Sequence, residues 1–180
     1  MSEARFSQLV SLACHDLRTP LATVYGFART LRRDDELGER QLKFVSMMEE
    51  ASEQMAGMLD DLATASRIEA GRWEPALREC NTLELVAGGR GEGATIETEV
   101  DGVKRGLEAL ATAAMRYGPT ESVAWDVRGR ELVLSPVLPA AGPVVVGEEP
   151  RDLGSLVARL VIEALGGSLA LDGETLTVRL

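Results

Sequence analysis

The fold of this chain is decided by the stretch Ser11-Leu12-Ala13-Cys14-His15-Asp16-Leu17-Arg18-Thr19-Pro20-Leu21, which contains its one histidine among 180 residues. Around this stretch, apolar residues recur at steps of three and four, the spacing of one face of an α-helix. They are Phe6, Leu9, Val10, Ala13, Leu17, Leu21, Val24, Phe27, Ala28 and Leu31. His15 falls off this apolar face, so we expect its ring to point toward solvent.

The residues beside His15 suit nucleophilic chemistry. An imidazole nitrogen is largely unprotonated near neutral pH and is a competent nucleophile. The adjacent Asp16 carboxylate can accept the other ring proton and fix the tautomer. Thr19 lies four residues after His15, so its hydroxyl stands on the same helical face and can hold a water molecule there. Pro20 removes a backbone donor, which predicts a bend beside the histidine.

A second amphipathic helix is predicted from about residue 37 to residue 70. It should end at Gly71, a residue type that favours the cap after a helix, with Pro75 blocking continuation. Two antiparallel helices of this length cannot bury their apolar faces alone. We therefore expect residues 1–75 to form a helical hairpin that pairs with a second copy, giving a homodimeric four-helix bundle with the histidines outside. The apolar positions of the second helix are Leu42, Val45, Met48, Met55, Met58, Leu59, Leu62 and Ile68.

Composition excludes several classes of function. The formal net charge is −10, which argues against a nucleic-acid partner because phosphate contacts need clustered Lys and Arg. No apolar run is long enough to span a bilayer, and we expect no membrane association. Cys14 and Cys80 lack metal-ligand spacing, and His15 has no second histidine to complete a site, so no metal is expected. A reduced, cytoplasmic setting is the simplest for such cysteines.

Residues 76–180 read as a separate α+β domain. Strand-like runs are separated by Gly, Asp and Pro, and two helical patterns stand among them. The helices are expected at about 103–117 and 153–165. Strands and helices mixed in this way favour a small α/β sandwich. The expected strands are 94–100, 122–127, 131–134, 144–146, 168–171 and 175–180.

The stretch around His15 resembles the phosphoacceptor box of two-component histidine kinases, and further strings extend the resemblance. Ser66-Arg67-Ile68-Glu69-Ala70-Gly71-Arg72 looks like the exit of their dimerisation hairpin. Residues 107–118 look like the first nucleotide-binding box of their ATPase domain, and 153–167 like the last box and its helix. Residues 176–180 resemble the closing strand. The resemblance implies a dimerisation and histidine phosphotransfer hairpin followed by an ATPase-like domain of the histidine kinase type.

The second domain departs from this family at the positions that hold ATP. Ala109 and Ala113 stand where the family places asparagines, and alanine has no oxygen to offer Mg²⁺. Ser135 and Pro136 stand where its Asp-x-Gly-x-Gly adenine box should begin. Residues 140–150 are too short for the usual ATP lid. The resemblance thus implies a degenerate ATPase domain with no nucleotide cofactor.

From these features we expect a histidine phosphotransferase of a two-component phosphorelay. His15 would shuttle phosphoryl groups between the aspartates of response-regulator receiver domains, with an upstream hybrid histidine kinase as a further partner. Asp16 would tune the imidazole, Thr19 would assist dephosphorylation, and Arg18 would face the receiver pocket. Two alternatives stay open. One is a non-catalytic module that binds and inhibits a receiver or kinase, and the other is a true sensor kinase with a divergent ATP site.

Overall fold

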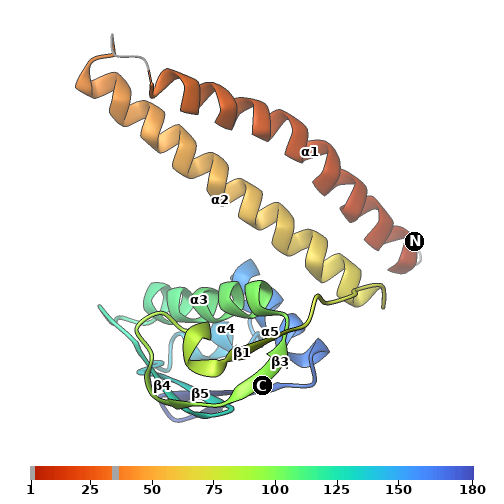
Figure 1. The fold of residues 1–180 in the computed structure, drawn as a ribbon, viewed down its shortest axis with the longest axis vertical. Coiled ribbons are helices and arrows are strands. Elements are labelled where there is room, and N and C mark those ends of the chain that lie inside the picture. The colour runs from red at the N-terminus through yellow and green to blue at the C-terminus, as the bar shows by residue number, and fades with distance from the viewer. Residues whose placement is uncertain (1–2, 34–36) are drawn as a thin grey trace. The chain divides into compact units, whose positions relative to one another are not determined.

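The computed structural model describes residues 3–33 and 37–180, with side chains from Cys14 onward and at Val10 (Figure 1). The chain divides into two compact units, Met1–Arg72 and Trp73–Leu180. The first holds helix α1 (Glu3–Leu31) and helix α2 (Glu39–Glu69), which pack along each other as an antiparallel hairpin. The side chains of Phe6, Leu9 and Ala13, which were expected on the apolar face, are not among those that the structure describes.

The hairpin interior is lined by a mixture of apolar, small and polar side chains. On α2, the buried and half-buried positions recur at alternating steps of three and four, the heptad spacing of packed helices. On α1, Cys14 and Ala28 are buried opposite them. Ser52 and Glu49 are buried among apolar residues, and Arg32 satisfies Glu49 with a contact of 2.7 Å. The α2 positions are Leu42, Val45, Glu49, Ser52, Ala56, Leu59, Ala63 and Ser66.

The largest apolar side chains of the hairpin form a second, exposed seam. This exposed seam consists of two heptad-spaced rows, one on each helix. The side chain of Phe27 is 68% exposed and that of Met58 is 54% exposed. A soluble monomer rarely leaves so extended an apolar stripe in water. The exposed seam comprises Leu17, Val24, Phe27 and Leu31 on α1 and Phe44, Met48, Met55, Met58 and Leu62 on α2.

The end of α2 follows from local chemistry. Gly71 adopts a positive φ of 62°, and its N–H donates to the carbonyl of Ile68. The N–H of Arg72 donates to the carbonyl of Arg67 at 2.9 Å. These bonds satisfy carbonyls that would otherwise be left free at the helix end. The predicted cap at Gly71 is therefore present.

The second unit is a sheet covered by helices. Five strands pair in the order β2-β4-β5-β7-β6, all antiparallel except β2 with β4, and β1 and β3 form a separate two-stranded sheet. On β4 and β7 the buried apolar side chains alternate along the strand and share one face, which gives the core, whereas three consecutive apolar residues of β5 are all buried. The bounds are β1 Arg78–Asn81, β2 Arg90–Gly93, β3 Thr95–Thr98, β4 Ala124–Gly129, β5 Glu131–Ser135, β6 Ser168–Asp172 and β7 Thr175–Arg179. Among the core residues are Trp125, Val127, Leu132, Leu134, Leu176 and Val178.

Helices α3 (Val100–Tyr117) and α5 (Leu153–Ala164) cover that face and pack against each other. Small residues let them approach closely: a Cβ added to Gly106 would lie 3.1 Å from the Ala158 Cβ. Side chains cap both helices. The Glu99 carboxylate accepts the N–H of Gly102 at 2.6 Å, and the Asp152 carboxylate accepts the N–H of Ser155 at 2.9 Å.

One expected element was wrong. Residues 144–146 were expected as a strand because valine favours extended backbone. They belong instead to the short helix α4 (Gly142–Val145) and its cap, because Pro143 starts a helical turn and the Val144 and Val145 side chains are buried in the core. The expectation also omitted β1, β2 and the 3₁₀-helix η1 (Thr82–Leu85). Within the described helices, none combines the length and apolar character needed to cross a bilayer.

Candidate phosphoacceptor site

His15 lies on the exposed surface of α1, as its position off the apolar face predicts. Its side chain is 77% exposed, and that of Asp16 is 68% exposed. The His15 Nδ1 atom lies 3.2 Å from the Asp16 Oδ1 atom. A proton on Nδ1 would donate to this carboxylate, which leaves the lone pair of Nε2 free. With that tautomer, Nε2 of the exposed ring would be the nitrogen with a free lone pair.

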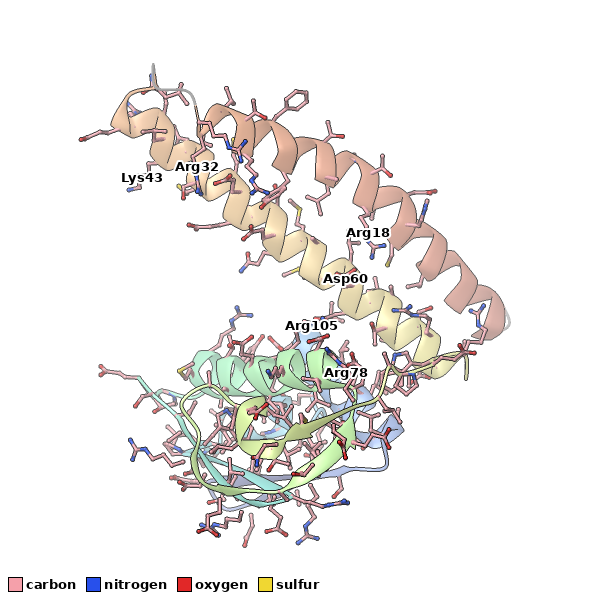
Figure 2. The ribbon with its side chains drawn as sticks, in the orientation of Figure 1. Arg18, Arg32, Lys43, Asp60, Arg78 and Arg105 are labelled. Carbon is pink, nitrogen blue, oxygen red and sulfur yellow. The ribbon has the colours of Figure 1, made fainter. Side chains whose placement is uncertain are left out.

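Thr19 and Arg18 follow His15 on the same helix, within one turn. Thr19 is exposed, and its carbonyl accepts a hydrogen bond from the hydroxyl of Thr23 at 3.1 Å. Arg18 reaches across the hairpin: its Nη2 atom lies 2.5 Å from Oδ1 of Asp60 on α2. Figure 2 shows the two side chains extending toward one another from the two helices. The structure therefore adds Asp60 as the partner of Arg18.

A groove begins at Arg18 and runs between α1 and α2. It has a volume of about 320 Å³ and its lining is mostly apolar. The Tyr25 hydroxyl donates to the Glu53 carboxylate across it at 3.0 Å. This hydrogen bond, with the negative charge of Glu53, raises the pKa of Tyr25 above its ordinary value of 10.0. The lining residues are Arg18, Leu21, Ala22, Tyr25, Ser52, Glu53 and Ala56.

Sequence patterns did not identify Asp60, Tyr25 or Glu53. Their roles depend on which residues of α1 meet which residues of α2, and that register is a tertiary property. The available signal was the position of Asp60 and Glu53 seven residues apart on α2, which places both on one side of that helix. Among the described residues, no cluster of three or more His, Cys, Asp and Glu has the arrangement of a metal site.

In the second unit, the positions expected to lack ATP ligands lie at tightly packed places. Ala113 on α3 is fully buried. Ala109 is half-buried against α5. A Cβ added to Gly154 on α5 would lie 2.8 Å from the Ala109 Cβ. Ser135 and Pro136 follow the buried Leu134 at the end of β5 and are half-buried. None of the four side chains offers a carboxylate or an amide.

The segment from Val137 to Asp152 is folded onto the core. Val137, Ala141, Val144 and Val145 are all buried. The Tyr117 hydroxyl donates to the carbonyl of Arg151 at 2.9 Å, and Arg159 donates to the carbonyl of Val146 at 3.1 Å. The segment between β5 and α5 is thus anchored by apolar burial at α4 and, after α4, by hydrogen bonds from α3 and α5.

Comparison with known proteins agrees with the hairpin geometry. Residues 7–71 match the His Kinase A (phospho-acceptor) domain. The chain is 30% identical to the sensor protein KdpD of Mycobacterium tuberculosis over 203 residues, covering 90% of this chain and 24% of that protein. It is 29% identical to the sensor protein DivL of Caulobacter vibrioides over 110 residues, covering 61% of this chain and 14% of DivL. The chain therefore spans about a quarter or less of the length of these relatives.

Solved structures share the fold of both units. Full-length ShkA, crystallised in complex with AMPPNP, superposes with a TM-score of 0.63 at 18% identity, covering 95% of this chain and 44% of that chain. The Acinetobacter baumannii histidine kinase AdeS gives a TM-score of 0.50 at 16% identity, covering 92% of this chain and 97% of that chain. The two-helix hairpin followed by an α/β sheet domain matches the arrangement of a histidine kinase hairpin and ATPase-like domain.

Proposed function

The chain carries a histidine-kinase-like dimerisation and phosphoacceptor domain, and from this premise we propose that it is a histidine phosphotransferase of a two-component phosphorelay. His15 accepts a phosphoryl group from the aspartate of one response-regulator receiver domain and passes it to another. The observation that carries the proposal is the exposed His15 ring with Nδ1 held by Asp16. An imidazole that is 77% exposed can be reached by a receiver domain without any rearrangement of the hairpin.

Each neighbouring residue has a role in this proposal. Asp16 takes the Nδ1 proton as Nε2 attacks the phosphoryl group, so the phosphorylated ring is not left as a positively charged imidazolium. Thr19 holds a water molecule for dephosphorylation of the partner. Arg18, at the rim of the groove, faces the acidic pocket of a receiver domain. Charge complementarity of this kind favours docking and speeds association.

The second unit supports a function that uses no ATP. Alanines at 109 and 113 give Mg²⁺ no oxygen ligand. Val137, Ala141, Val144 and Val145 are buried, and no side chain of residues 137–145 carries a charge for binding phosphate. The alignment with KdpD runs over 203 residues, more than this chain of 180, so the relative contains segments with no counterpart here. In this proposal the second unit is a docking surface or spacer.

The exposed seam supports a homodimer. Two hairpins that pair along it remove Phe27, Met55, Met58 and their neighbours from water, each square ångström of apolar surface contributing about 25 cal/mol. The heptad spacing of the seam suits a four-helix bundle. Because His15 lies outside both the hairpin interior and the exposed seam, pairing leaves the phosphoacceptor accessible on each protomer.

A second candidate is a sensor kinase with divergent nucleotide chemistry. It is favoured by the names of the relatives, several of which are sensor proteins or histidine kinases. This candidate requires that the second unit bind ATP through residues other than those at 109, 113, 135 and 136. It predicts labelling of His15 by ATP alone.

The proposal is tested by phosphotransfer from receiver domains. Receivers of the source organism are labelled with [³²P]acetyl phosphate, freed of donor and mixed with the purified chain without ATP. We expect an acid-labile, base-stable label on the chain and none on His15→Gln, with both proteins dimeric. A receiver that binds and transfers nothing would contradict the phosphotransferase and favour the inhibitory module.

A further inference from the structure

The ion pair between Arg18 and Asp60 ties the two helices together one turn after His15. The Arg18 Nη2 and Asp60 Oδ1 atoms are 2.5 Å apart, and the side chains are 50% and 52% exposed. Figure 2 shows the pair bridging α1 and α2. Asp60 thus determines where the guanidinium nearest to His15 on α1 is held.

We propose that Asp60 is a positioning residue and that Arg18 exchanges Asp60 for the phosphoryl group when His15 is phosphorylated. The cross-helix tie then exists in the unphosphorylated hairpin and is released in the phosphorylated one. This inference rests on the proposed role of His15 as the phosphoacceptor. It goes beyond that role by assigning the hairpin a device that responds to phosphorylation.

The geometry permits the exchange. Residues three apart on a helix lie on the same side, with Cβ atoms about 5–6 Å apart. The long Arg18 side chain can therefore reach a group attached to His15 as well as one on the facing helix. Asp16 contacts the Nδ1 side of the ring, so the phosphoryl group would sit on Nε2, away from the Asp16 carboxylate.

The energetics favour the exchange. Exposed ion pairs contribute little to stability because solvent screens them, so breaking the Arg18–Asp60 pair costs little. A phosphoryl group carries more negative charge than a carboxylate and presents three acceptor oxygens to the guanidinium fork. Asp60 is half exposed, so water can solvate its carboxylate after Arg18 has left.

A chemical donor tests this exchange without a receiver domain. Phosphoramidate transfers its phosphoryl group to imidazole: its P–N bond breaks, a new N–P bond forms at His15, and the displaced ring proton leaves with the nitrogen as ammonia. Because the chain has one histidine, phosphohistidine forms at one residue, and ³¹P NMR identifies the ring nitrogen that carries the phosphoryl group. The reaction separates this inference from the proposed function, since His15 is phosphorylated even where no receiver donates to it.

Two readouts are followed on the full chain. The first is the ¹⁵N resonance of the Arg18 Nε group, assigned with Arg18→Lys, before and after phosphorylation. The second is the equilibrium constant for phosphohistidine formation in Asp60→Asn, Asp60→Glu and the matched control Glu53→Gln. Glu53 is an acid on the same side of α2 that bonds Tyr25 instead of Arg18.

We expect the Arg18 resonance to shift on phosphorylation. Asp60→Asn removes the competitor for Arg18 and should shift the equilibrium toward phosphohistidine about two- to five-fold, the range of an exposed ion pair. Asp60→Glu and Glu53→Gln should leave the equilibrium constant for phosphohistidine formation as in the unmodified chain. In a chain that already carries Arg18→Ala, adding Asp60→Asn should not change this constant. An unmoved Arg18 resonance, or an equal shift in Glu53→Gln, would overturn the exchange.

Discussion

Gly154 at the start of α5 and Ala109 on α3 approach so closely that a Cβ added to the glycine would lie 2.8 Å from the Ala109 Cβ. Neither position has a flexible side chain that can move away. We expect Gly154→Ala to destabilise the second unit by about 1–3 kcal/mol, because overpacking forces the helices apart. Urea unfolding followed by tryptophan fluorescence measures this, since Trp125 lies in the core of that unit.

Gly26→Ala is the matched control. Gly26 lies on α1 with no atom within 4 Å of an added Cβ. Alanine there should be neutral or stabilise the hairpin by about 0.5–1 kcal/mol, because glycine is a poor helix former. An unchanged midpoint for Gly154→Ala would mean that α3 and α5 do not pack at the distance described.

The exposed seam predicts that one charge will separate the protomers. Met55→Glu places a carboxylate at the centre of the seam on α2, where pairing would bury it without a partner. We expect a monomer by light scattering at micromolar concentration, with reduced helicity. Gln54→Glu adds a charge one residue away, on an exposed position outside the seam, and should stay dimeric. A dimeric Met55→Glu would mean that the protomers pair through another surface.

The hydrogen bond from Tyr25 to Glu53 predicts an alkaline limit to stability. Its raised pKa means that the folded chain holds the phenolic proton more tightly than the unfolded chain. The contribution of this bond is present below the ordinary value of 10.0 and is lost as pH rises through the folded pKa. The phenolate absorbance is measured against pH for the native chain and for Tyr25→Phe, and the difference between the two curves gives the titration of Tyr25. Glu53→Gln should lower its midpoint, and an unmoved midpoint would contradict the assignment.

The contact between Asp16 and His15 predicts a loss of rate without loss of fold. Asp16→Asn keeps an oxygen that can accept a hydrogen bond from Nδ1 but removes the base that can take its proton. Phosphoryl acceptance by His15 should therefore slow by about ten- to a hundred-fold, at or below the lower end of general-base effects because the pair is exposed. Asp16→Glu retains a carboxylate and should recover most of the rate. Rapid-quench kinetics measures it, and an unchanged rate in Asp16→Asn would remove Asp16 from the mechanism.

The sequence predicts the hairpin well because both helices carry long apolar repeats and Gly71 marks an end. It does not distinguish the residues of the hairpin interior from those of the exposed seam, because the interior includes polar residues such as Glu49 and Ser52. It also cannot predict the Arg18–Asp60 pair, which depends on the register between the helices.

In the second unit, local pattern and tertiary context compete. Helices α3 and α5 were predicted within a few residues, because their apolar faces and their ends are clear. Strands β1 and β2, Arg-Glu-Cys-Asn and Arg-Gly-Glu-Gly, have no apolar alternation and form through pairing with neighbours. Val144 and Val145 favour a strand by themselves, but in the folded unit they lie in the short helix α4 with their side chains buried.

The central claim is that His15 carries phosphate supplied by a partner and not by ATP. Parallel labelling of one protein preparation tests it most directly: one sample receives Mg²⁺ and [γ-³²P]ATP, and the other receives ³²P-labelled receiver domains without nucleotide. We predict acid-labile label on His15 in the receiver sample alone. Labelling of His15 by ATP in the absence of any other protein would contradict the account and identify the chain as a kinase.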